Sequence, residues 1–140
     1  MPTRLHSIRI ARPPSAVFAA IADVTTHHRW QAGLVRSEPD GNSHTVGARG
    51  AEIRRFFGRE VRFPYEITVY EAPGRWGFRA LGGPVRPEAV LALEVRDDGT
   101  CVTSRLTVPG LLGWLVIGAM LRQQRKNYRT LKQLLETGSL

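Results

Sequence analysis

Few residues in this chain of 140 have the type and spacing that catalysis needs. His27 and His28 are adjacent, so on a helix their side chains point about 100° apart and do not readily hold one metal ion. No His-Glu-x-x-His motif, no spaced His/Asp set and no thiol beside a histidine occurs. The sequence therefore predicts no metal site and no cofactor. His28 could face the mouth of a cavity as an acid–base group, although a capping or surface position is the simpler interpretation.

A second set of polar side chains interrupts otherwise apolar patterns. Gln124 breaks the apolar stripe of the C-terminal segment, and a buried amide costs roughly 2–7 kcal/mol unless it finds hydrogen-bond partners. Tyr65, Ser104, Asn127 and Tyr128 likewise share a face with apolar neighbours. Taken singly, each fits a satisfied core or rim group. Taken together, they match the usual makeup of a small-molecule site, an apolar pocket with a few convergent polar groups.

Arginine is the remaining residue type that could contact a ligand. The strand predicted over residues 47–57 offers one face with Arg55 and another with Arg54, and the pattern does not say which points inward. Either face can place a guanidinium near a cavity, where it would pair with a carboxylate or phosphate. The alternative is an exposed or salt-bridged edge residue.

The element that must position Gln124 and Tyr128 is a long helix over residues 109–136. It follows the Pro109-Gly110 breaker and contains no further proline. Its apolar stripe recurs at steps of three and four and contains Ile117, Leu121, Gln124, Tyr128, Leu131 and Leu135. The opposite face carries Arg122, Arg125, Lys126, Arg129 and Lys132. The second half of the helix therefore has one dry face and one basic face.

The first half of this helix, residues 111–121, carries no charge. Leu111, Trp114 and Leu115 project on the side that later bears the arginines, so the segment is apolar all round. Neighbouring loops could cover it; a homodimer contact, a membrane surface and the mouth of a hydrophobic pocket are the alternatives. The glycines at positions 110, 113 and 118 fit either close packing of the helix against the sheet or a portal through which a ligand enters. The 13 residues from 109 to 121 are too few for a transmembrane helix, which needs roughly 20.

The rest of the chain predicts one strand, two small helices and about six further strands. Residues 4–11 alternate between apolar and polar, as in a half-buried strand. Pro13 and Pro14 suit a first helical turn, and Thr25 with Thr26 can cap a second short helix. From 33 to 108 the apolar period is two, with breakers at 40–42, 58, 73–74, 82–84 and 97–99. Short connections and strict alternation indicate an antiparallel meander with one dry face, and hence one α+β domain over 1–140.

Composition limits the classes of partner. The net charge of +8 comes from 18 arginines and two lysines, a balance that favours anionic partners. The arginines are scattered, however, and no nucleic-acid motif accompanies them, so nucleic-acid binding is not expected. The single cysteine, Cys101, excludes an internal disulfide framework. The N-terminal residues have no apolar run that could serve as a signal peptide, so a cytoplasmic location is expected.

This order of elements resembles the START-like helix-grip superfamily, the polyketide cyclase/dehydrase and lipid-transport group (SRPBCC). The matching segments are IRIARPPSAVFAAIADVTTHHRW, FPYEITVYEAPGRWGFRA, DDGTCVTSRLTV and, in the long helix, NYRTLKQLLE. Each motif is loose, but their order and spacing cover nearly the whole chain. The resemblance implies a helix-grip fold, in which a curved seven-stranded antiparallel sheet wraps around a long C-terminal helix. It also implies a cavity for hydrophobic ligands between sheet and helix.

The dry strand faces and the helix stripe then supply the candidate ligand-binding residues. They are Phe63, Tyr65, Ile67, Trp76, Phe78, Leu91, Leu93, Ser104, Leu106, Ile117, Met120, Gln124 and Tyr128.

Three functions follow as hypotheses. The first is binding or transport of a hydrophobic small molecule, such as a lipid, an isoprenoid or a polyketide-like compound. The second is an enzyme of the polyketide cyclase/dehydratase type that uses the same cavity without a metal; it requires a titratable group inside that cavity. The third is a peripheral membrane or protein-binding module that uses residues 111–121.

Overall fold

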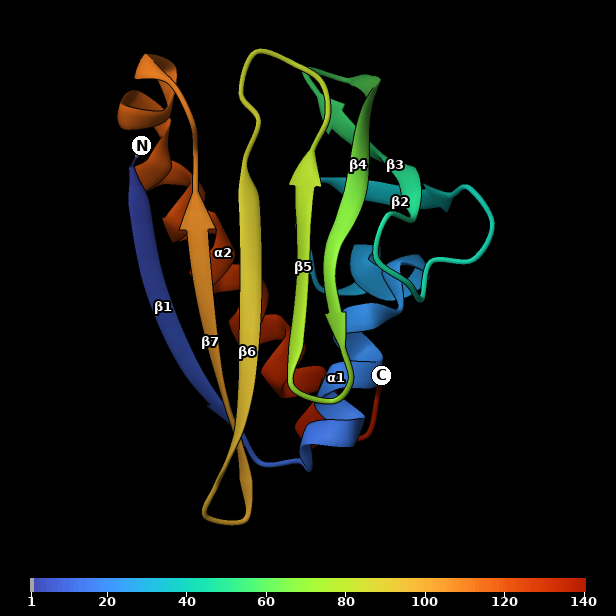
Figure 1. Ribbon diagram of the computed structural model, residues 1–140, viewed down its shortest axis with the longest axis vertical. Helices are drawn as coiled ribbons and strands as arrows, with labels where there is room; N and C mark the ends of the chain where they lie inside the picture. The colour runs from blue at the N-terminus through green and yellow to red at the C-terminus, as the bar shows by residue number, and fades with distance from the viewer. Residues whose placement is uncertain (1) are drawn as a thin grey trace.

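A seven-stranded antiparallel sheet and one long helix make up most of the computed structural model, which describes residues 2–140 (Figure 1). In chain order the elements are β1 (Thr3–Ile10), α1 (Pro14–Ala22), the 3-10 helix η1 (Val24–Arg29), β2 (Leu34–Pro39), β3 (Arg49–Phe56), β4 (Arg59–Glu71), β5 (Arg75–Ala80), β6 (Glu88–Arg96), β7 (Gly99–Thr107) and α2 (Leu111–Glu136). The strand order is β1-β7-β6-β5-β4-β3-β2, so β2 and β1 are the free edges.

The sheet curves around α2. In Figure 1, α2 runs diagonally behind β1, β7 and β6, while α1 lies behind the lower ends of β4 and β5. Within residues 2–140, the connection from β1 to β2 is the only one that does not join neighbouring strands, and it carries both short helices. The predicted α+β helix-grip fold is confirmed, with a sheet of seven strands and the long helix at its predicted place.

The turns lie where the breakers in the sequence predict them. At the β3–β4 turn, Phe57 and Gly58 both have positive φ, of 50° and 78°. Two consecutive residues with positive φ make the type of tight turn that matches strand twist. A positive φ is unusual for a bulky residue. Phe57 adopts it here, and its side chain is fully exposed at the tip of the turn.

The two short helices begin for local reasons. Pro14 stands at the first position of α1, where its missing N–H costs no hydrogen bond. The carboxylate of Asp23 caps η1 by accepting a hydrogen bond of 3.1 Å from the backbone N–H of Thr25. The cap is therefore Asp23, and the expectation that Thr25 and Thr26 supply it was wrong, because the 3-10 helix already begins at Val24.

The core joins the C-terminal half of α2 to α1 and the sheet. Leu131 and Leu135 pack in one buried cluster with Val17 and Ile21 of α1 and with the inner faces of β4 to β7. A smaller cluster, Leu106, Val108 and Ile117, holds the N-terminal half of α2. There a Cβ on Gly113 would clash with the carbonyl oxygen of Val108, so this glycine permits the first turn of α2 to pack closely against the segment that follows β7.

The first turns of α2 are only partly covered. Leu111 is 87% exposed, Leu115 81% and Trp114 60%, so neighbouring loops do not cover this side of the helix. Among residues 2–140, no helix combines the length and the hydropathy that a bilayer crossing requires.

Candidate functional site

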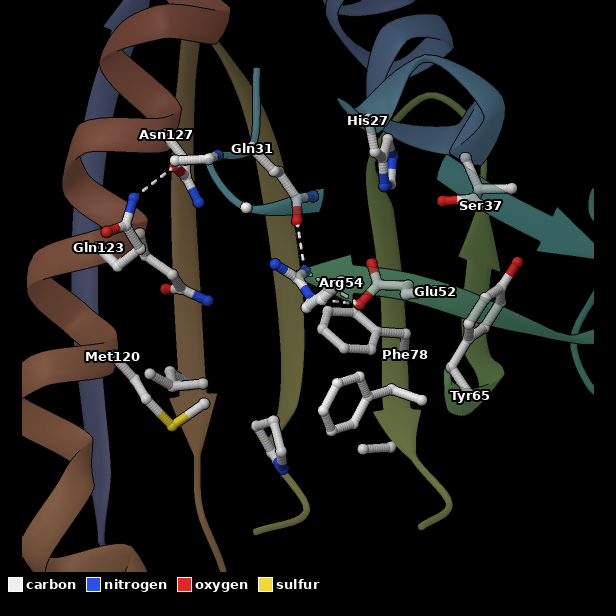
Figure 2. Close-up of a pocket in the computed structure, with 18 of the residues that line it drawn as sticks. His27, Gln31, Ser37, Glu52, Arg54, Tyr65, Phe78, Met120, Gln123 and Asn127 are labelled. Carbon is white, nitrogen blue, oxygen red and sulfur yellow. Dashed lines mark hydrogen bonds and ion pairs between the residues drawn. The ribbon is translucent and has the colours of Figure 1, made fainter. Parts of the chain in front are cut away.

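A cavity of about 580 Å³ lies between α2 and the inner face of the sheet (Figure 2). Its walls come from the short helices, the segment 31–33, six strands and α2. The lining residues are Ile21, Val24, His27, Trp30, Gln31, Ala32, Gly33, Ser37, Glu52, Arg54, Arg55, Phe56, Phe63, Pro64, Tyr65, Trp76, Phe78, Ala80, Val85, Pro87, Leu91, Leu106, Val116, Ala119, Met120, Gln123, Gln124, Asn127 and Tyr128. The set is mostly apolar, with a minority of polar side chains.

The structure brings most of the sequence-based candidates to this wall. Those that line it are Phe63, Tyr65, Trp76, Phe78, Leu91, Leu106, Met120, Gln124 and Tyr128. The other four, Ile67, Leu93, Ser104 and Ile117, are buried but do not line the cavity. As ligand contacts, all of these residues stay predictions.

The cavity opens along the gap between α2 and the β2–β3 side of the sheet. Six of its lining residues are exposed, namely Ala32, Gly33, Arg55, Phe56, Ala119 and Gln123. They belong to three elements, the segment 31–33, the end of β3 and the middle of α2. These elements therefore form the mouth.

Asn127 ties two sides of the mouth together. Its Oδ1 atom accepts a hydrogen bond of 3.2 Å from the backbone N–H of Ala32 and one of 3.0 Å from Nε2 of Gln123. Asn127 is only 8% exposed, so the interaction is largely shielded from water. The side chain links the 31–33 segment to α2 and limits how far they can separate.

Strand β3 directs Glu52 and Arg54 toward the cavity. The Arg54 guanidinium lies 3.0 Å from Oε1 of Glu52 and donates a hydrogen bond of 2.8 Å to Oε1 of Gln31. Both ionic side chains are mostly buried, with Arg54 26% and Glu52 19% exposed. The sequence did not show which face of β3 points inward. In the structure it is the face with Arg54, and the more exposed Arg55 lies at the cavity mouth.

Tyr128 connects α2 to strand β7. Its hydroxyl donates to Oγ of Ser104 over 3.3 Å, and Ser104 in turn donates to Oε1 of Gln124 over 3.5 Å. The amide that interrupts the apolar stripe thus has a partner. Burial raises the pKa of Tyr128 to about 12, and burial with the nearby charge of Glu52 raises the pKa of Tyr65 to about 12. Both phenols therefore keep their protons at neutral pH.

His27 is the imidazole of this cavity. It is 3% exposed, and its Nε2 lies 2.6 Å from the carbonyl oxygen of Ile21. The rings of Trp30 and Trp76 flank it, with centroids 5.0 and 5.7 Å away. Burial lowers the pKa of His27 more than the Ile21 carbonyl and Glu52 raise it. The ring is therefore neutral at pH 7, with Nε2–H donating to Ile21 and Nδ1 left as an acceptor.

The sequence pattern favoured a capping or surface position for His28 and indicated no role in the cavity for His27. His28 is exposed and does not line the cavity. The 3-10 geometry of η1 directs its neighbour inward instead. The sequence did contain a signal for His27. The apolar residues Val24 and Trp30 stand three positions on either side of it, and at this spacing the side chains of a 3-10 helix share one face.

Polar and apolar linings occupy different parts of the cavity. In Figure 2, His27, Gln31, Glu52, Arg54 and Asn127 lie in the upper part, whereas Phe78 and Met120 lie below. The lower part is the one next to the first half of α2. Two further buried donors in the walls, the indole Nε1 atoms of Trp30 and Trp76, have no hydrogen-bond partner among the described residues. The space thus suits a molecule with one polar end.

The side chains that could ligate a metal are dispersed in the part of the chain that the structure describes. No three side chains among its His, Cys, Asp and Glu residues come close enough together to hold an ion. Glu52 is engaged with Arg54, and His27 has no second imidazole beside it among the lining residues described.

Comparison with known proteins agrees with the fold. A family model described as "Polyketide cyclase / dehydrase and lipid transport" matches residues 3–136. No curated protein matches the sequence. Among solved structures, protein MLL2253 from Mesorhizobium loti has a TM-score of 0.81 at 16% identity, over 99% of this chain and 100% of that one.

Two further solved structures are similar. TTHA0849 from Thermus thermophilus has a TM-score of 0.71 at 20% identity, over 97% of this chain and 95% of its own. Ara h 8.0201 has a TM-score of 0.79 at 13% identity, over 97% of this chain and 98% of its own. At these identities the likeness concerns the fold alone.

Proposed function

We propose that this chain, which belongs to the polyketide cyclase/dehydrase and lipid transport family, binds a hydrophobic small molecule between α2 and the sheet. The ligand is a lipid, an isoprenoid or a polyketide-like compound with one polar end. The observation that carries the proposal is the cavity of about 580 Å³ with its largely apolar lining. Sites for drug-sized molecules usually have volumes of about 300–1,000 Å³ and this kind of lining.

The arrangement of polar groups suggests the orientation of the ligand. The polar end would lie near His27, Gln31 and Arg54, and the apolar end near Phe78 and Met120. An apolar chain placed there would gain roughly 25 cal/mol for each Å² removed from water. The candidate contacts from the sequence, including Ile67, Leu93, Ser104 and Ile117 just behind the wall, form part of this proposal.

Native mass spectrometry of the purified protein tests the proposal. We expect a bound mass that organic extraction removes and that incubation with a lipid, an isoprenoid alcohol or an aromatic polyketide restores. Ala119→Trp, which places an indole at the mouth, should reduce the reloading. Gln133→Trp, on an exposed position of the same helix, should not. A bare protein mass under all loading conditions would reject ligand binding.

A second function, cyclisation or dehydration of a polyketide-like substrate, is favoured by the position of His27. Such a reaction begins when a base removes a proton from a carbon next to a carbonyl group. A neutral imidazole whose Nε2 hydrogen is held by Ile21 leaves Nδ1 free to accept that proton. Incubation with a poly-β-keto thioester, followed by product analysis, tests this. A cyclised or dehydrated product that disappears in His27→Gln supports an enzyme; unchanged substrate in the wild type supports a carrier.

A further inference from the structure

Large apolar side chains are exposed at one end of the molecule. On α2 these are Leu111, Leu112, Trp114 and Leu115, which are 42–87% exposed. At the end of β3 and the turn that follows they are Phe56 and Phe57, which are 48% and 104% exposed. We call these six residues the apolar rim. In Figure 1 the start of α2 and the β3–β4 turn lie at the upper end, on either side of the β5–β6 loop, whereas the β6–β7 turn is at the lower end.

The apolar rim is continuous with the cavity mouth. Phe56 belongs to both, since it lines the cavity and is half exposed. On α2, Leu112 and Leu115 precede the mouth residue Ala119 by seven and four positions, so they share its side of the helix. A hydrophobic molecule that leaves the cavity would pass directly over these side chains.

Positive charge flanks the rim on both elements. The segment 55–62 around the β3–β4 turn carries Arg55, Arg59 and Arg62 against one acid, Glu60. Of these arginines only Arg55 has a carboxylate partner within 4.0 Å among residues 2–140. On α2 the exposed Arg122 and Lys126 continue the outer face that begins with Leu111 and Leu115, and they too lack a carboxylate partner in the described structure.

We propose that the apolar rim docks on an anionic lipid bilayer. The leucines and aromatic rings enter the interface while the arginines contact lipid phosphates, a combination of apolar area and positive charge that favours membrane surfaces. A second copy of the chain fits this surface less well, because each copy has a net charge of +8 and would meet the same cations on its partner. Docking would turn the cavity mouth toward the bilayer.

Vesicle flotation tests the docking without any cavity ligand. Phosphatidylcholine vesicles are compared with vesicles that contain phosphatidylglycerol as well, at low and high salt. We expect binding only to the anionic vesicles, weaker at high salt, with a blue shift of Trp114 emission. Replacing Phe57 and Leu115 together by serine should weaken binding at least about tenfold, since two apolar side chains no longer enter the interface.

Control variants for the flotation experiment lie at the opposite end of the molecule from the apolar rim. Val95 is 71% exposed and lies at the end of β6, next to the β6–β7 turn, so Val95→Ser should leave vesicle binding unchanged. Arg122→Glu should weaken binding, and Arg96→Glu should not. The proposal is overturned if the wild type does not float with anionic vesicles or if Val95→Ser weakens flotation as much as the rim variant. It is also overturned if the rim variant alters only self-association in sedimentation velocity.

Discussion

The Nε2 atom of His27 lies 2.6 Å from the backbone carbonyl oxygen of Ile21 and so carries a hydrogen that it donates to α1. This contact joins η1 to α1 and fixes the tautomer of a buried imidazole in the cavity wall. The same bond holds the ring between Trp30 and Trp76. It therefore has consequences for stability as well as for ligand contact.

The first consequence concerns pH. Burial lowers the pKa of His27 in the folded state, so the unfolded chain takes up a proton more readily than the folded one. The free energy of unfolding should therefore be highest above the unfolded pKa of about 6.5 and decrease as the pH falls below it. Urea titrations at pH 7.5 and 5.5 measure this loss.

His27→Gln isolates the contribution of this residue, since glutamine can still donate to the Ile21 carbonyl but does not titrate. The variant should lose less stability between the two pH values than the wild type. His6, whose pKa is lowered by burial and by Arg125 and Arg129, contributes in the same direction, so His6→Gln is the comparison. An equal loss in wild type and His27→Gln would show that the imidazole does not titrate as described.

The two halves of α2 should differ in their effect on stability. Leu131 is 1% exposed in the main core, and Leu131→Ala should cost about 2–5 kcal/mol of unfolding free energy, because it opens a cavity in packed surroundings. Leu115→Ala, on the same helix but 81% exposed, should change it by less than about 0.5 kcal/mol. Chemical denaturation compares the two. A large loss in Leu115→Ala would mean that the N-terminal half of α2 is covered in solution.

The sequence predicted the fold well because its signals are local. Strand alternation, turn breakers and the stripe of α2 each depend on neighbouring residues, and all three appear in the structure. The wall of the cavity depends on how elements meet. The face of β3 that points inward depends on how this strand is placed in the sheet between β2 and β4. No pattern within residues 47–57 contains that information.

The histidine pair illustrates the same limit. The apolar residues at three-residue spacing around His27 mark one face of η1, but only the placement of η1 in the fold brings that face to the cavity and leaves His28 outside. Ile67 and Ile117, in contrast, lie on the predicted faces but behind the wall. A face that is known to be buried does not tell which of its residues border an open space, because that depends on the curvature of the whole sheet.

Asn127 should control the mouth. Asn127→Ala removes the acceptor for the Ala32 N–H and should cost about 1–3 kcal/mol of stability, since the bond is largely buried. It should also speed exchange of a bound probe. Hydrogen exchange at the Ala32 amide and stopped-flow release measure the two effects. Gln133→Ala, on the exposed face of α2, is the control; identical release rates in both variants would contradict a role for Asn127 at the mouth.

The Glu52–Arg54 pair should set the charge preference of the cavity. In the wild type the carboxylate neutralises the guanidinium at 3.0 Å. Glu52→Gln leaves Arg54 available and should strengthen binding of the anionic probe 1-anilinonaphthalene-8-sulfonate by about tenfold. Binding of the neutral probe N-phenyl-1-naphthylamine should change little. Arg54→Gln should instead weaken binding of the anionic probe. If a variant changed the affinity for both probes in parallel, charge would not be the cause.

The most direct test of ligand binding in the cavity is a fluorescence titration with N-phenyl-1-naphthylamine. The wild type should bind one probe per chain, and a natural hydrophobic ligand should displace it. Met120→Trp, which fills the apolar part of the cavity, should weaken probe binding at least about tenfold, while Gln133→Trp on the outer face should bind like the wild type. Equal binding by wild type, Met120→Trp and Gln133→Trp would contradict the assignment of this cavity as the binding site.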